Sequence, residues 1–127
     1  MNQEDKELLL QDLCARLPYG VKIKTSYDKM DEPIELRFVN PRSKYFAIGG
    51  EFTLISGLDF DTYECKPYLF PLSSMTEEQK KEEYEICKEY IIGYESNLID
   101  FYHRNHFDYR GLIEKGLAID ATNSNIY

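Results

Sequence analysis

The sequence has no tryptophan, only two histidines, and no long apolar run. Its three cysteines are an odd number without CxxC spacing, which excludes a disulfide framework and a zinc ribbon as patterns. No apolar stretch reaches the ~18 residues of a membrane-spanning helix, and the first residues carry acids where a signal peptide carries bases. We therefore expect a cytoplasmic protein with no membrane partner.

Positive charge is also scarce. Lys and Arg number 15 against 23 Asp and Glu, which gives a formal net charge of −8. An acidic chain repels nucleic acid and anionic membranes, so the composition argues against both as partners. An acidic surface usually serves solubility, and in fewer proteins it receives a basic partner or imitates a nucleic-acid backbone. If the chain has a macromolecular partner, we expect a protein.

The chain is long enough for one domain with a real core. It has 127 residues, 43% of them hydrophobic, and the aromatic residues include 11 Tyr. Tyrosine has an apolar body and a polar tip, so these rings suit the boundary of a small core, and a surface rich in them could also bind. We expect residues 1–127 to form a single domain: an N-terminal helix over 1–18, a β core over 19–72, a helical segment over 76–118 and a polar, frayed tail over 119–127.

Apolar spacing predicts the first helix and then a sheet. Leu10, Leu13, Cys14 and Leu17 recur at helical intervals, and Pro18 ends the pattern. Alternating or short apolar runs separated by turns then predict strands over 21–25, 34–39, 45–48, 52–55 and 63–66. Within 34–39 the alternation places Ile34, Leu36 and Phe38 on one face.

Tight turns between these strands favour an antiparallel sheet. Gly49 and Gly50 separate two apolar runs, as in a hairpin. The fold class we predict is α+β: the N-terminal helix, an antiparallel sheet of about four to five strands curled as an SH3-like open barrel, and a C-terminal helical segment packed on it. Residues 66–72, with two prolines, are expected to be an extended exit from this sheet.

The sharpest local signal is a capping box formed by Thr76 and Gln79. Beyond it, six apolar or aromatic positions share one helical face: Tyr84, Cys87, Ile91, Tyr94, Leu98 and Phe101. Gly93 falls within the pattern, so either one kinked helix or two helices are compatible with it.

One candidate metal site lies in the second helical segment. Asp100, His103 and His106 are three residues apart, and carboxylate and imidazole groups on one helical side can bind a transition metal. The alternative is that the histidines cap or pack near the end of a helix. The pattern identifies no catalytic residue and specifies no cofactor.

The most distinctive polar cluster follows at once. Asp108, Tyr109 and Arg110 precede Gly111, and with His106 they are the candidate binding residues. Arg110 could offer a bidentate donor to a partner carboxylate. In the structural alternative, Asp108 pairs with Arg110 or caps the next turn, while Tyr109 packs against the barrel.

Three blocks of the sequence resemble a known family. They are LPYGVK at 17–22, KPYLFPLSSMT at 66–76, and HFDYRGLI at 106–113 followed by Gly-Leu-Ala at 116–118. They are similar to the blocks of short, uncharacterised proteins typical of prophages and other mobile elements in gut Bacteroidales. This resemblance implies no activity, cofactor or catalytic residue.

Two function classes follow from these observations. The first is a non-catalytic interaction protein, an accessory or host-modulating factor of a mobile element, which uses an acidic, tyrosine-rich surface. The second is a small barrel that binds nucleic acid or a small ligand, by analogy of fold alone. A metal-dependent enzyme is the third reading.

Overall fold

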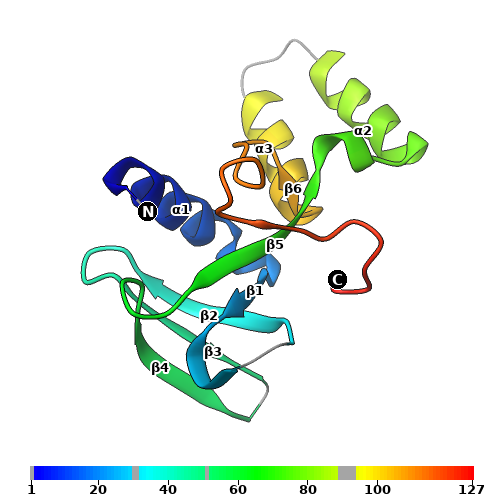
Figure 1. The fold of residues 1–127 in the computed structure, drawn as a ribbon. Coiled ribbons are helices and arrows are strands. Elements are labelled where there is room, and N and C mark those ends of the chain that lie inside the picture. Colours follow the sequence, from blue (N-terminus) through cyan, green and yellow to red (C-terminus); the bar gives the residue numbers. More distant parts are fainter. Residues whose placement is uncertain (1, 30–31, 51, 89–93) are drawn as a thin grey trace.

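The computed structural model describes residues 2–29, 32–50, 52–88 and 94–127. Figure 1 shows a twisted sheet with the N-terminal helix beside it, and the later helices at the opposite end of the molecule. In chain order the elements are α1 (Gln3–Arg16), the 3-10 turn η1 (Leu17–Tyr19), β1 (Lys22–Thr25), η2 (Tyr27–Lys29), β2 (Ile34–Asn40), β3 (Tyr45–Gly49), β4 (Leu54–Asp59), β5 (Cys65–Pro71), η3 (Leu72–Ser74), α2 (Glu77–Lys88), α3 (Tyr94–Arg104), β6 (Phe107–Asp108) and β7 (Ile119–Asp120). The α+β class is confirmed.

The sheet is mixed, so the prediction of an antiparallel sheet is wrong for its C-terminal part. Its strand order is β4-β3-β2-β1-β5-β6, with β7 also paired to β5. β1 to β5 pair antiparallel, whereas β6 and β7 both run parallel to β5. The chain reaches β6 only after the two helices α2 and α3, and such a long crossover permits parallel pairing. No pairing within the described ranges closes the sheet, and the SH3-like barrel stays a prediction.

A β-bulge changes which side chains face the core. The register between β2 and β3 shifts between Leu36 and Phe38, so β2 carries one extra residue there. Leu36 remains buried, but Phe38 is 54% exposed and Val39 takes its place in the core. The prediction that Phe38 shares a face with Leu36 is therefore wrong, because the bulge reverses the alternation of side chains.

The predicted hairpin between β3 and β4 forms around a required glycine. Gly49 pairs with Leu54, where β4 begins. A Cβ atom on Gly49 would overlap the backbone carbonyl of Thr53, so only glycine allows the two strands to approach this closely. The strand predicted over 52–55 starts later and continues to Asp59. Glu51 lies outside the described residues.

The main core lies between α1 and the sheet. Leu9, Leu10 and Leu13 of α1 pack against Ile23 of β1 and Ile48 of β3. The helical face predicted from Leu10 and Leu13 is confirmed, and Cys14 and Leu17 border the core half-buried. Burial of such side chains against a sheet face is what holds an amphipathic helix in place.

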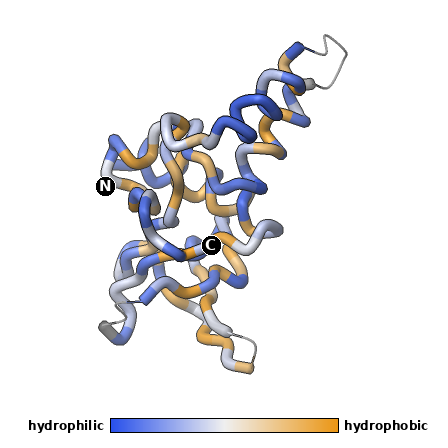
Figure 2. Tube along the Cα trace, turned by 90° about the vertical axis from the view of Figure 1, so that its right-hand side faces the viewer, coloured by the Kyte–Doolittle hydropathy of each residue, from blue (hydrophilic) through white to orange (hydrophobic). Residues whose placement is uncertain are grey.

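The C-terminal helical segment contains two separate described helices that lie side by side (Figure 1). The capping box is confirmed: the Gln79 amide donates to Thr76 Oγ1, and the Thr76 amide donates to Gln79 Oε1. Tyr84, the first residue of the predicted apolar face, is 65% exposed, so the fold does not bury this end of the face. Ile91 and Gly93 lie outside the described residues. α2 buries no side chain fully, and Figure 2 shows it as a mostly hydrophilic projection.

The segment predicted as an extended exit and the segment predicted as a frayed tail both join the sheet. Residues 66–71 continue the predicted last strand as part of β5, which lies between β1 and β6. The tail is not frayed: Ile119 and Asp120 pair with β5, and the Tyr127 hydroxyl donates to the carbonyl of Tyr68 at 2.8 Å. Among the helices in the described ranges, none has the length and apolar character needed to cross a membrane.

Candidate binding site

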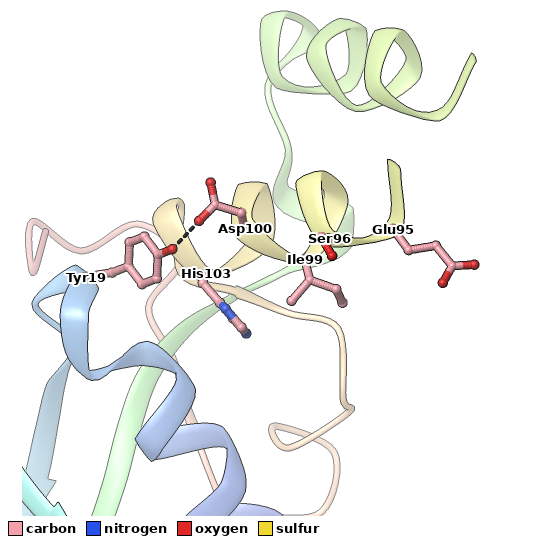
Figure 3. Close-up of a pocket in the computed structure, with 6 residues that line it drawn as sticks. All are labelled: Tyr19, Glu95, Ser96, Ile99, Asp100 and His103. Atoms are coloured by element: carbon pink, nitrogen blue, oxygen red, sulfur yellow. Dashed lines mark hydrogen bonds between the residues drawn. The ribbon is translucent and has the colours of Figure 1, made fainter. Parts of the chain in front are cut away.

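An open groove lies between η1 and α3 (Figure 3). Its volume is about 480 Å3, and it is lined by Tyr19, Glu95, Ser96, Ile99, Asp100 and His103. Tyr19 is the one lining residue from η1, which Pro18 and the left-handed Gly20 hold as a tight turn after α1. The other five come from α3. The groove therefore joins two segments about 80 positions apart in the sequence.

Tyr19 and Asp100 form one wall of the groove. The Tyr19 hydroxyl donates a hydrogen bond to Asp100 Oδ1, drawn as a dashed line in Figure 3. This bond to a carboxylate raises the pKa of Tyr19 above its ordinary value, so the phenol stays protonated at neutral pH. The hydrogen bond fixes the orientation of the carboxylate at the surface.

His103 lies deeper in the groove and is 7% exposed. Its Nε2 is 2.7 Å from the Tyr109 hydroxyl, and its ring centroid is 6.0 Å from that of Tyr19. Burial, followed by the charge of Arg16, lowers the pKa of His103 below its ordinary value. The imidazole is therefore neutral at pH 7 and contributes no positive charge to the groove.

A buried ion-pair network lies behind His103 and Tyr109. Asp12 of α1 is fully buried and accepts from two arginines: Arg16 Nε at 2.8 Å and Arg110 Nε at 3.0 Å. The Tyr109 ring lies beside both guanidinium groups, with Arg16 Cζ at 5.6 Å and Arg110 Cζ at 5.0 Å from its centroid. The network links α1 to the segment after β6 and positions Tyr109 against His103.

Two buried polar atoms lie at the other end of this network. Arg16 Nη2 donates to the carbonyl of Phe107 at 2.6 Å, while Arg16 Nη1 has no partner among the described residues. Within the same described part of the chain, His106 Nδ1 also has none. The His106 ring is stacked on the Tyr127 ring at a centroid distance of 3.6 Å. Arg16 Nη1 and His106 Nδ1 are each placed where a buried water could form the missing hydrogen bond.

The candidate metal residues do not assemble. Asp100 and His103 line the groove, but His106 stacks under Tyr127 of the tail instead. In residues 2–29, 32–50, 52–88 and 94–127, no three His, Cys, Asp or Glu side chains gather closely enough to hold a metal ion. The positive φ of His106 (60°) turns the chain after α3, so the three-residue spacing does not continue on one helical side.

The polar cluster at 108–110 serves the fold. Asp108 accepts hydrogen bonds from the amides of Leu112 and Ile113, both at 2.9 Å, which confirms the capping alternative. Arg110 does not pair with Asp108, because its guanidinium forms an ion pair with Asp12 of α1 instead. Tyr109 stacks on Tyr102 of α3 at a centroid distance of 5.4 Å, so its predicted packing against the barrel is wrong.

Truncation of Asp108 tests this capping role. We expect Asp108→Ala to lower the free energy of unfolding by about 1–3 kcal/mol, because two amides beside a buried site lose their acceptor. Asp120→Ala is the matched control, since Asp120 accepts from the Thr122 amide at an exposed position. Urea unfolding of both variants provides the measurement. A smaller loss for Asp108→Ala than for the control would contradict the assignment.

Sequence reasoning missed Asp12, Arg16, Tyr19 and Glu95. Asp12 and Arg16 have the i,i+4 spacing of a helical ion pair, which was the available signal. That spacing is usual for exposed pairs, so it does not indicate burial. Tyr19 belongs to a block quoted above, but its contact with Asp100 depends on how η1 and α3 meet.

Comparison of the chain with protein-family models, with curated proteins and with solved structures finds no match.

Proposed function

We propose that this chain is a non-catalytic interaction protein that binds a basic segment of a partner protein in the groove between η1 and α3. The observation that carries the proposal is the groove's lining: Glu95 and Asp100 contribute two carboxylates, and none of the six lining residues is Lys or Arg. The net charge of −8 adds a long-range attraction for a basic partner.

The lining fits the side chain of a lysine or arginine. Asp100 would accept from the cationic head, and the adjacent Tyr19 ring could add a cation–π contact. Ile99 supplies an apolar surface for the methylene stem. Because Tyr19 already orients Asp100, little side-chain entropy is lost when a ligand binds.

The setting of this function is part of the same proposal. The quoted sequence blocks favour an accessory or host-modulating factor of a mobile element, acting in the cytoplasm. We also propose that β1 to β5 form an SH3-like open barrel. The bulge in β2 and the irregular register between β3 and β4 support it, since bulges increase the twist and curvature that such a sheet needs.

Peptide binding tests the proposal. We expect a fluorescein-labelled peptide rich in Lys and Arg to bind the protein, and Asp100→Asn to weaken that binding about tenfold through loss of a charge-assisted contact. The Asn variant keeps an oxygen that can accept from Tyr19, so the wall of the groove is preserved. Fluorescence anisotropy against peptide concentration is the measurement.

A charge-matched control separates the groove from general attraction. Asp120→Asn removes the same charge from β7, outside the groove, and we expect it to leave peptide affinity unchanged. Equal weakening by the two substitutions would show that net charge alone attracts the peptide. That result, or no binding by the unmodified protein, would refute the proposal.

A further inference from the structure

The outer face of β2, β3 and β4 carries large exposed side chains. Phe38 is 54% exposed, Tyr45 44% and Leu54 64%. The register places these side chains on one face of the sheet: Val39 and Phe46 are paired and buried, so their neighbours Phe38 and Tyr45 point to the opposite face. Leu54 pairs with Gly49, which alternation places on that same face of β3.

This arrangement depends on the bulge in β2. Without the bulge, regular alternation would place Phe38 on the same face as Leu36, toward the core. The core is on the other side of the sheet, where α1 packs. Among the aromatic contacts between described residues, none involves Phe38 or Tyr45, so both rings offer open faces. Phe52, in the loop before β4, is 95% exposed.

The β2–β3 hairpin that carries these rings has more basic than acidic residues. The fifteen positions from Leu36 to Gly50 include Arg37, Arg42 and Lys44 and no acidic residue, in a chain of net charge −8. Arg37 is paired with Glu35 at 2.8 Å on the same strand. Arg42, in the turn between β2 and β3, makes no ion pair with any residue that the structure describes. Two acids also adjoin this face, because Glu35 belongs to β2 and Asp59 of β4 lies directly opposite Tyr45. The β2–β3 hairpin from Ile34 to Gly49 still has three bases against one acid, so its net charge is opposite in sign to that of the molecule as a whole.

The size of this face favours an extended ligand. Three strands about 4.8 Å apart and about 18 Å long cover roughly 250 Å2. A stable interface between globular proteins needs about 800 Å2 on each partner. The face is too small for such an interface but spans two or three nucleotides of an extended strand.

We propose that this face binds single-stranded nucleic acid. Bases stack on Phe38 and Tyr45, as they do on exposed aromatic residues of other sheets, and the phosphates lie along Arg42 and Lys44. Adjacent open rings flanked by cations favour this ligand over an acidic peptide, which has no flat groups to stack. The ligand makes no use of the groove between η1 and α3, and the two sites are on different elements.

Binding of a labelled oligothymidylate of roughly 12 nucleotides, followed by fluorescence anisotropy at low salt, tests the assignment. We expect Phe38→Leu and Tyr45→Leu each to weaken binding about tenfold, because leucine keeps apolar bulk but cannot stack. Phe38→Tyr should retain affinity. Tyr84→Leu is the matched control: Tyr84 is also an exposed ring, at 65%, but it lies on α2, and its loss should have no effect.

The salt dependence supplies a second, independent readout. Replacing Arg42 and Lys44 together by Ala should reduce the slope of log affinity against log salt by about 1.4 for a single strand, or 0.7 per phosphate contact. Circular dichroism melting confirms that each variant folds.

Three results would overturn the proposal: no binding of the oligonucleotide at low salt, equal weakening by Tyr84→Leu, or preferential binding of an acidic peptide that Phe38→Leu abolishes. The basic-peptide assay with Asp100→Asn reports on the groove alone. Failure at the sheet face therefore leaves the proposed function of the groove unaffected.

Discussion

Replacement of Asp12 by alanine should lower the free energy of unfolding by about 3–5 kcal/mol. Asp12 is fully buried and is the acceptor for both Arg16 and Arg110. Without it, the guanidinium of Arg16, which has no exposed surface, remains in the core with its positive charge uncompensated. The desolvation cost of that charge exceeds anything the alanine gains. Urea unfolding monitored by circular dichroism measures the change.

Two further variants identify the cause. Glu77→Ala removes an acid that pairs with Lys80 at an exposed position, and its cost should stay below about 1 kcal/mol. In Asp12→Leu combined with Arg16→Met, the buried charge is also removed, so part of the lost stability should return. A cost below about 1 kcal/mol for Asp12→Ala would contradict the network described above.

Stability should also fall as the solution is acidified from about pH 6.5 to about pH 4. Burial against the Tyr127 ring, with the charge of Arg16 nearby, lowers the pKa of His106 to about 4 from an ordinary 6.5. Above pH 6.5 the residue is neutral in both the folded and the unfolded chain, so the stability is fully present there. Between the two values the unfolded chain binds a proton that the folded chain does not, which removes on the order of 3 kcal/mol.

Substitution of His106 isolates this contribution from that of His103, whose pKa is lowered in the same direction. Asparagine suits the position, because it tolerates the left-handed backbone that His106 adopts at φ 60°. We expect His106→Asn to be less stable at pH 7 but to lose less stability on acidification. Chemical unfolding at pH 7, 5.5 and 4.5 gives the comparison. Equal acid sensitivity of the two proteins would mean that His106 is not held neutral.

The local elements could be predicted because their causes are local. The face of α1 with Leu10 and Leu13, the capping box of Thr76 and Gln79, and the hairpin at Gly49 each depend on residues within a few positions of one another. Helical periodicity, a capping pair and a glycine turn leave such patterns in any sequence. The capping role of Asp108 is of the same kind, since its partners are four and five residues away.

The groove and the network behind it could not be predicted in this way. Tyr19 meets Asp100, and Arg110 meets Asp12, across separations of 81 and 98 residues. No spacing rule in one sequence records which carboxylate an arginine will find across the fold. The exposed position of Phe38 is a subtler case, because one extra residue in β2 reversed a strand alternation that was otherwise read correctly.

For this protein, sequence alone determined the α+β class, the first helix, the strands of the antiparallel hairpins and the acidic balance. Tertiary structure decided that β6 and β7 join β5 in parallel, that Asp12 and Arg16 are buried, and that Tyr19 and Asp100 share a groove. The physical reason is one of range. Backbone preference and amphipathic spacing act between near neighbours, whereas burial and long-range pairing depend on how the whole chain packs.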